Sequence, residues 1–112
     1  MRLQTVVETP AYLGAAKGVL TEAERIAVVN MVAENPLAGI PLGGGVRKAR
    51  FGRSGRGKSG GVRIVFLFWS EEIPVFLLTV FAKNEKGNLS RGERAALTKA
   101  AKQMARDYGR RT

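Results

Sequence analysis

The chain has 112 residues and a formal net charge of +10, with neither cysteine nor histidine. This length predicts one domain spanning residues 1–112. The missing Cys and His exclude disulfides, thiolate zinc sites and the usual general base near neutral pH, so no metal and no cofactor is expected. No apolar run approaches the roughly 18 residues of a membrane span, and no secretory signal opens the chain, which predicts a soluble cytoplasmic protein.

The positive charge is concentrated in two blocks. Residues 43–63 carry seven cations and no acid, together with eight of the fourteen glycines. Residues 91–112 add a net +5, whereas residues 1–42 and 64–90 each come to −1. This concentration predicts an anionic partner.

The chain begins with a predicted strand and a short helix. Residues 2–8 (RLQTVVE) have the character of a strand. Thr9 and Pro10 suit the cap and the first position of a helix, and Gly18 is expected to end it.

A second helix is expected directly afterwards, which completes a helical hairpin. Thr21 and Glu24 have the spacing of a capping box. The sequence Asn35-Pro36 is expected to stop the helix. Apolar residues recur at helical spacing between these signals, namely Ile26, Val29 and Ala33.

The next segments predict the sheet. We expect residues 37–45 to be a connector and VRKARF, residues 46–51, to be a strand with a solvated cationic face. GVRIVFLFWS and PVFLLTVFAK are continuous apolar runs separated by Glu71-Glu72. Their length and their Val and Phe content predict adjacent antiparallel strands, buried on both faces, at the centre of the sheet.

The C-terminal segment predicts a last helix. Ser90 and Glu93 form a second capping box. An apolar stripe follows at helical spacing, formed by Leu97, Ala101, Met104 and Tyr108. The element order β-α-α-β-β-β-α therefore predicts an α+β fold with helices against a small, mostly antiparallel sheet.

Residues 52–59, GRSGRGKS, match the pattern of a nucleotide-binding P-loop. A P-loop joins a buried strand to a helix and needs an Asp that helps to hold magnesium. Here a basic strand precedes the pattern, another strand follows it, and Asp107 near the end of the last helix is the only Asp. We therefore expect no nucleotide cofactor. Two interpretations remain, a solvated hairpin loop and a glycine loop whose cations meet a polyphosphate backbone.

The run GGGVRKARFGRSGRGKSGGVRIVF and the later VFAKNEKGNLS resemble the RelE/HigB-type toxins of type II toxin-antitoxin systems. The resemblance covers roughly residues 2–108 and implies a RelE-like fold. It also implies an endoribonuclease that enters the ribosomal A site and cuts mRNA without a metal, with the 2′-hydroxyl of the mRNA as nucleophile. By position in the motif, the implied catalytic residues are Lys58, Arg63 and Lys83. The residues implied to grip RNA phosphates are Arg47, Lys48, Arg50, Arg53 and Arg56.

Cations suit this chemistry, because the reaction needs a base, a group that neutralises charge on phosphorus oxygens and a proton for the leaving oxygen. Crowding by other cations is expected to lower the pKa of Lys58 and make it a base. The fork of Arg63 fits a phosphoryl group, and Lys83 serves the leaving oxygen. The family often has a Tyr near its C-terminus, but Tyr108 fits the buried stripe here. Stacking on a base would then fall to Phe66 or Phe51, and Phe66 is expected in the core.

The resemblance implies a cognate antitoxin, encoded next to the toxin and carrying a DNA-binding domain, besides the ribosome and its mRNA. No membrane partner is expected. Two alternatives remain at the level of sequence. One is a non-catalytic RNA- or DNA-binding module, and the other is a gyrase-inhibiting toxin of the ParE type, against which the presence of Lys58, Arg63 and Lys83 argues.

Overall fold

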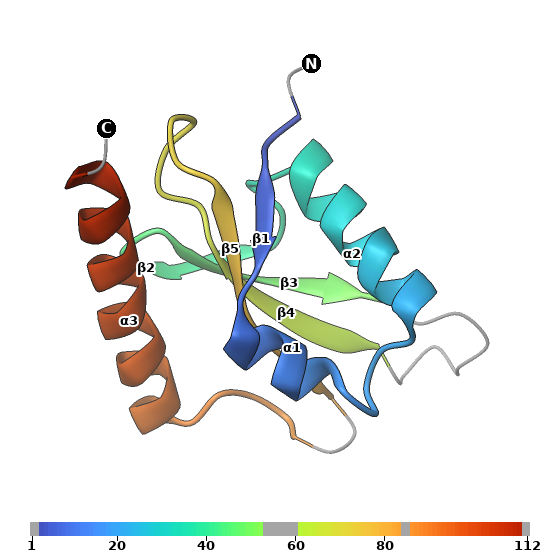
Figure 1. Ribbon diagram of the computed structural model, residues 1–112. Helices are drawn as coiled ribbons and strands as arrows, with labels where there is room; N and C mark the ends of the chain where they lie inside the picture. Colours follow the sequence, from blue (N-terminus) through green and yellow to red (C-terminus); the bar gives the residue numbers. More distant parts are fainter. Residues whose placement is uncertain (1–2, 53–60, 84–85, 111–112) are drawn as a thin grey trace.

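The computed structural model describes residues 3–52, 61–83 and 86–110 and has an α+β fold (Figure 1). The observed element order is β-α-α-β-β-β-β-α. In chain order the elements are β1 (Val6–Glu8), α1 (Pro10–Ala16), α2 (Glu22–Glu34), β2 (Ile40–Gly43), β3 (Val46–Phe51), β4 (Val62–Leu67), β5 (Val75–Ala82) and α3 (Arg91–Arg110).

The five strands form one sheet in the order β1-β5-β4-β3-β2. Only the β1–β5 pair is parallel, and the other three pairs are antiparallel. Strands β4 and β5 lie inside the sheet, and nearly all of their side chains are buried. This confirms the prediction of two central antiparallel strands and accounts for their uninterrupted apolar sequence.

Strand β2 is a correction to the expected connector. Its four residues, IPLG, pair antiparallel with β3 at the edge of the sheet. A proline is tolerated in an edge strand, because its missing N–H removes no bond from an interior ladder. A short, largely exposed strand with a proline leaves almost no pattern in the sequence.

Three consecutive glycines turn the chain from β2 into β3. Gly43, Gly44 and Gly45 have φ values of 108°, 62° and 85°, which side chains rarely permit. The turn is also tightly packed, because a Cβ on Gly45 would lie 3.0 Å from a Leu67 methyl carbon. The Gly45 carbonyl accepts a 2.9 Å hydrogen bond from the Phe68 amide.

The first strand is shorter than predicted. Only Val6–Glu8 pair with β5, and the Gln4 amide instead donates to the Ala33 carbonyl at the end of α2 (3.1 Å). The helix signals are confirmed. The Thr9 hydroxyl caps α1, and Thr21 and Glu24 make both hydrogen bonds of a capping box.

The buried face of α2 differs from the spacing noted in the sequence. Val28 and Val32 are fully buried, whereas Ile26 is 57% exposed. The helix has apolar residues around most of its circumference, so the spacing alone did not determine which residues face the sheet.

Helices cover both faces of the sheet (Figure 1). On one face α1 and α2 pack against Ala49, Ile64 and Leu77 among others. On the other face, here called the α3 side, the predicted stripe of α3 packs against Val46, Leu67 and Phe76. None of the helices in the described part of the chain is long and apolar enough to cross a membrane.

Candidate nucleic-acid interface

Five of the eight predicted site residues are described by the structure. Lys58, Arg53 and Arg56 lie outside the described residues, so their roles stay predictions. The described site residues lie on three neighbouring strands. Arg47, Lys48 and Arg50 are on β3, Arg63 is on β4, and Lys83 directly follows β5.

Side-chain alternation brings four of these cations to one face. Lys48 and Arg50 alternate in step with Val46, which packs under α3, and Arg63 alternates in step with Val65 on the same side. Lys83 lies two residues beyond Phe81, which is also on the α3 side. We call Lys48, Arg50, Arg63 and Lys83 the cationic row.

The α3 side of the sheet therefore has two halves. Helix α3 covers the apolar half, where Leu67, Phe76 and Leu78 are buried. The cationic row occupies the other half, with Lys48 and Arg63 half-buried and Lys83 exposed. A rigid sheet thus holds apolar packing and solvent-facing charge on one surface.

Arg50 and Arg63 are neighbours within the row. They are directly opposite each other in the β3–β4 ladder. Arg50 Nε and Arg63 Nη1 lie 3.6 and 3.7 Å from the point where a Gly61 side chain would begin, so these nitrogens are at most about 7 Å apart. The lack of a side chain at Gly61 leaves room for both guanidinium groups.

Lys83 joins the row through the next ladder. Its amide donates to the Gly61 carbonyl at 3.2 Å, which extends the β4–β5 pairing by one bond. Because Arg63 pairs with Phe81, Lys83 lies one diagonal step from Arg63 on the same face.

This arrangement concentrates positive charge on one surface. Like charges directly opposite each other in neighbouring strands repel. The ion pairs of Arg25 with Glu8 and of Lys86 with Glu93 include neither Arg63 nor Lys83. A surface of this kind favours binding of an anion that bridges the cations, such as a phosphate.

Arg47 does not share the solvated cationic face that is predicted for this strand and that Lys48 and Arg50 form. It alternates in step with Ala49, on the side of α1 and α2. Its guanidinium donates to the carbonyls of Leu37 (2.8 Å), Ala38 (3.1 Å) and Gly39 (3.1 Å). The side chain thus holds the segment before β2 against β3.

Sequence reasoning missed the residues that connect the row to the segment before α3. Lys48 Nζ donates to Asn88 Oδ1 at 2.8 Å, and the same oxygen accepts the Leu89 amide. The Lys86 ammonium lies 5.7 Å from the centroid of the Phe81 ring. The motif KNEKGNLS, residues 83–90, contained the signal, because it supplies these groups and the cap of α3.

The start of α3 is fixed by confirmed capping bonds. Ser90 and Glu93 exchange hydrogen bonds of 2.8 and 3.1 Å, and Lys86 forms an ion pair with Glu93. The hydrogen bond from Lys86, followed by that from the Ser90 amide, lowers the pKa of Glu93 to about 2. Glu93 therefore stays ionised through the physiological range and neutralises Lys86.

The aromatic residues are placed largely as expected. Phe66 is fully buried, and Phe51 packs at the edge of the same core. Tyr108 makes an edge contact with Phe76 (5.6 Å between ring centroids). Phe76 precedes Lys83 by seven residues, about 23 Å along an extended strand, so Tyr108 lies far from Lys83.

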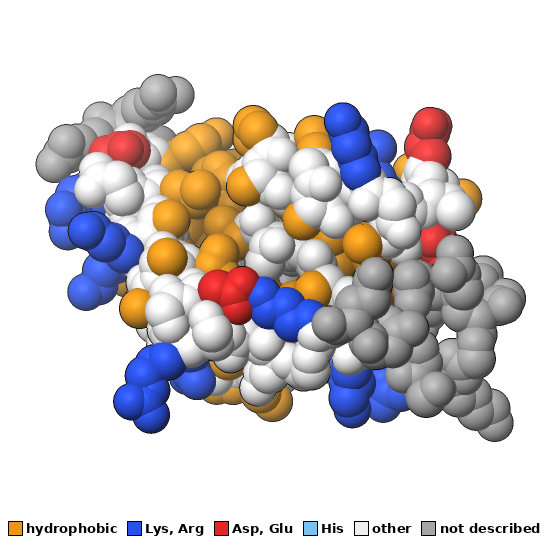
Figure 2. Space-filling view, turned by 90° about the horizontal axis from the view of Figure 1, so that it is seen from below, with side chains coloured by type: hydrophobic (Ala, Val, Ile, Leu, Met, Phe, Trp, Pro, Cys, Tyr) orange, Lys and Arg blue, Asp and Glu red, His pale blue; other side chains and the backbone are white. Residues whose placement is uncertain are grey.

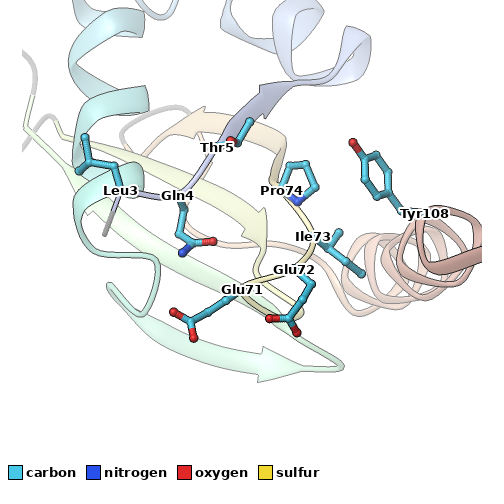
Figure 3. Close-up of a pocket in the computed structure, with 8 residues that line it drawn as sticks. All are labelled: Leu3, Gln4, Thr5, Glu71, Glu72, Ile73, Pro74 and Tyr108. Atoms are coloured by element: carbon cyan, nitrogen blue, oxygen red, sulfur yellow. The ribbon is translucent and has the colours of Figure 1, made fainter. Parts of the chain in front are cut away.

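A cavity of about 370 Å³ lies at the opposite end of the sheet (Figure 3). The turn between β4 and β5 brings Glu71 and Glu72 to it, and α3 contributes Tyr108. None of its lining residues is a Lys or Arg. Its chemistry does not suit a phosphate, and we do not assign it to the site.

A family model described as the RelE toxin of the RelE / RelB toxin-antitoxin system matches residues 14–109. The match runs from within α1 to near the end of α3. It therefore includes all four strands that surround or carry the cationic row, as well as the helix that covers the apolar half of the same face.

Proposed function

Because the chain belongs to the RelE toxin family, the toxins of toxin-antitoxin systems, we propose that it is a metal-independent endoribonuclease that cuts mRNA in the ribosomal A site and so inhibits translation. The family also implies an antitoxin partner. The observation that carries the proposal is the cationic row, in which Arg50 and Arg63 lie directly opposite each other on a rigid sheet.

The proposed chemistry is attack of a 2′-oxygen on the adjacent phosphorus, with departure of the 5′-oxygen. The non-bridging oxygens on the phosphorus gain negative charge in the transition state, and the planar fork of Arg63 is suited to neutralising it. Lys83, one diagonal step away, is assigned the donation of a proton to the leaving oxygen. Lys58 is assigned the role of base by its position in the motif.

Lys48 and Arg50 are assigned the binding of flanking phosphates. Both are on the same face as Arg63, and Lys48 is oriented by Asn88. Arg53 and Arg56 are assigned the same role from the sequence alone. Arg47 is withdrawn from this set, because its guanidinium hydrogen bonds are directed to backbone carbonyls.

The antitoxin is proposed to be the product of a neighbouring gene with its own DNA-binding domain. An acidic segment of such a protein would bind the cationic row and exclude RNA from the same cations. Co-expression with the neighbouring open reading frame, followed by co-purification, tests this part of the proposal.

The activity is tested by mapping the 5′ ends of an mRNA on purified translating ribosomes after addition of the protein. We expect cuts at the A-site codon that leave a 5′-hydroxyl and a cyclic phosphate. A 2′-deoxy nucleotide on the 5′ side of the scissile bond should abolish them. Arg63→Ala and Lys83→Ala should each lower kcat about 10²-fold or more, as loss of a transition-state contact does.

Lys17→Ala is the control, because this exposed cation at the end of α1 lies outside the site. Binding of ribosomes without cutting would reject the endoribonuclease in favour of a non-catalytic RNA-binding module. Intact mRNA together with loss of DNA-gyrase activity would favour the ParE-like alternative. Near-wild-type cleavage by Arg63→Ala would remove that residue from the mechanism.

A further inference from the structure

Helix α3 has a second, charged face that the proposed reaction does not use. The stripe that packs on the sheet is apolar and includes the buried Ala101 and Ala105. The opposite side faces solvent, and Figure 2 shows its Lys and Arg side chains along the outside of the molecule at the left. We call this side the outer face of α3. Its exposed cations are Arg91, Lys99, Lys102 and Arg106.

These cations are aligned by the helical repeat. Successive members are separated by eight, three and four residues, so they stay on one side of the helix over about 22 Å. The two acids of the helix are on other sides. Glu93 pairs with Lys86, and Asp107 accepts a hydrogen bond from Gln103 (2.8 Å).

The outer face lacks compensation within the part of the chain that the structure describes. Lys99, Lys102 and Arg106 stand three and four residues apart, a spacing at which like charges repel on a helix. Arg91 and Arg94 are also in the first turn, where the helix dipole disfavours cations. Arg94 has a structural role, because its Nη2 donates to the Leu42 carbonyl at 2.9 Å. No described carboxylate pairs with Arg91, Lys99, Lys102 or Arg106.

The surface between these side chains is suited to a phosphate chain. An open groove of about 500 Å³ runs along the helix, lined by Arg91, Arg94, Ala95, Thr98, Lys99 and Lys102. A protein partner is the less suitable occupant, because the centres of protein interfaces are depleted of Lys and enriched in aromatic residues. This groove has four cations and no aromatic residue. Phosphate contacts need only exposed Lys and Arg.

We propose that the outer face of α3 is a second RNA-binding surface, which holds phosphates of structured RNA in the target particle rather than the strand being cut. The inference rests on the proposed function. The outer face is turned away from the sheet, and the width of a helix, about 10 Å, separates it from the surface that carries Arg63. Phosphates bound there are therefore distinct from the scissile one, and the surface sets affinity without taking part in cleavage.

The test compares the wild-type protein with Lys99→Gln/Lys102→Gln/Arg106→Gln, which spares Arg94 and its bond to Leu42. Binding to 70S ribosomes is measured as a function of salt, and cleavage of ribosome-bound mRNA is measured as kcat and KM. We expect KM and Kd to rise about tenfold or more near 0.1 M salt while kcat changes less than twofold. The slope of log Kd against log salt should become shallower by two to three units, since three phosphate contacts are lost.

A charge-matched pair of variants distinguishes binding by the outer face of α3 from a general effect of net charge. Lys102→Glu and Lys17→Glu change the charge equally, and we expect only Lys102→Glu to weaken ribosome binding. Equal effects of the two, or an unchanged Kd and slope in the triple variant, would overturn the inference while wild-type cleavage upholds the proposed function. Loss of binding to poly-glutamate with unchanged ribosome binding would assign the surface to an acidic protein instead. A wild-type protein that does not bind ribosomes would overturn both proposals.

Discussion

Arg47 is the cation for which a structural role and an RNA-binding role predict the most clearly different experimental results. Its guanidinium makes three hydrogen bonds to consecutive carbonyls before β2, one partly buried and two exposed. We take about 1 kcal/mol for the partly buried bond and about 0.5 kcal/mol for each exposed one, below the usual range for charged donors because of solvent screening. Arg47→Gln should therefore lower the free energy of unfolding by about 2 kcal/mol.

The variant Arg47→Lys distinguishes the contribution of the guanidinium hydrogen bonds to stability from that of the positive charge. A lysine keeps the positive charge but satisfies only one carbonyl well, so it should lose about half of the stability, or about 1 kcal/mol. For a domain of this size 1 kcal/mol corresponds to about 4 °C in Tm. We expect Tm to fall by about 8 °C in Arg47→Gln and by about 4 °C in Arg47→Lys, and by less than about 2 °C in the control Lys17→Gln.

Thermal unfolding followed by circular dichroism measures these differences, and salt-dependent RNA binding provides the second readout. If Arg47 is structural, the slope of log Kd against log salt is the same in Arg47→Gln and the wild type. A slope reduced by about one unit together with an unchanged Tm would show that Arg47 contacts a phosphate. That result would refute our interpretation of the three carbonyl contacts.

Three further predictions concern stability and pH. Gly39→Ala should unfold at markedly lower urea concentration than the wild type, because its φ is +75° and a Cβ would lie 2.0 Å from a carbonyl oxygen of β3. The matched control Gly14→Ala, in an open position on α1, should gain about 0.5–1 kcal/mol; equal effects would contradict the steric argument. Burial, followed by the charge of Glu8, raises the pKa of Tyr12 to about 12 from 10.0, so its stabilising contribution is full below pH 10 and is lost as pH rises towards 12. Tyr12→Phe should remove that alkaline loss and should not destabilise the protein at pH 7, because the buried hydroxyl has no hydrogen-bond partner; a lower Tm at pH 7 would indicate an unseen partner. The depressed pKa of Glu93, about 2 against 4.5, makes its contribution present above pH 4.5 and lost as pH falls towards 2. The Tm difference between wild type and Glu93→Gln should therefore shrink over that interval, and a constant difference would argue against the ion pair.

The elements with the strongest local signals were predictable from sequence. Strands β4 and β5 have continuous apolar sequences because both of their faces are covered. The capping box of Ser90 and Glu93 marks the start of α3 by hydrogen bonds that depend only on local spacing. The resemblance to RelE/HigB-type toxins was also visible in the sequence, and the RelE family model confirms it over residues 14–109.

The features that the sequence did not reveal depend on the register between strands and on the edge of the sheet. The approach of Arg50 to Arg63 follows from the pairing of β3 with β4, which no single strand encodes. From sequence, Arg47 was assigned to RNA binding together with Lys48 and Arg50. Alternation along β3 shows that Arg47 lies on the opposite face only when the side on which Ala49 is buried is known. Strand β2 was missed because an edge strand with a proline needs little apolar character.

The glycine turn between β2 and β3 has a consequence for dynamics. Glycine-rich segments are commonly equated with mobility, yet Gly43, Gly44 and Gly45 all have positive φ, and Gly45 packs tightly against Leu67 and Trp69. The bond from the Phe68 amide to the Gly45 carbonyl anchors the turn to the end of β4. Here glycine is required by backbone shape, so the amide order parameter of Gly45 should be close to that of the rigid strands, about 0.85. In this protein, glycine content is therefore a poor measure of disorder.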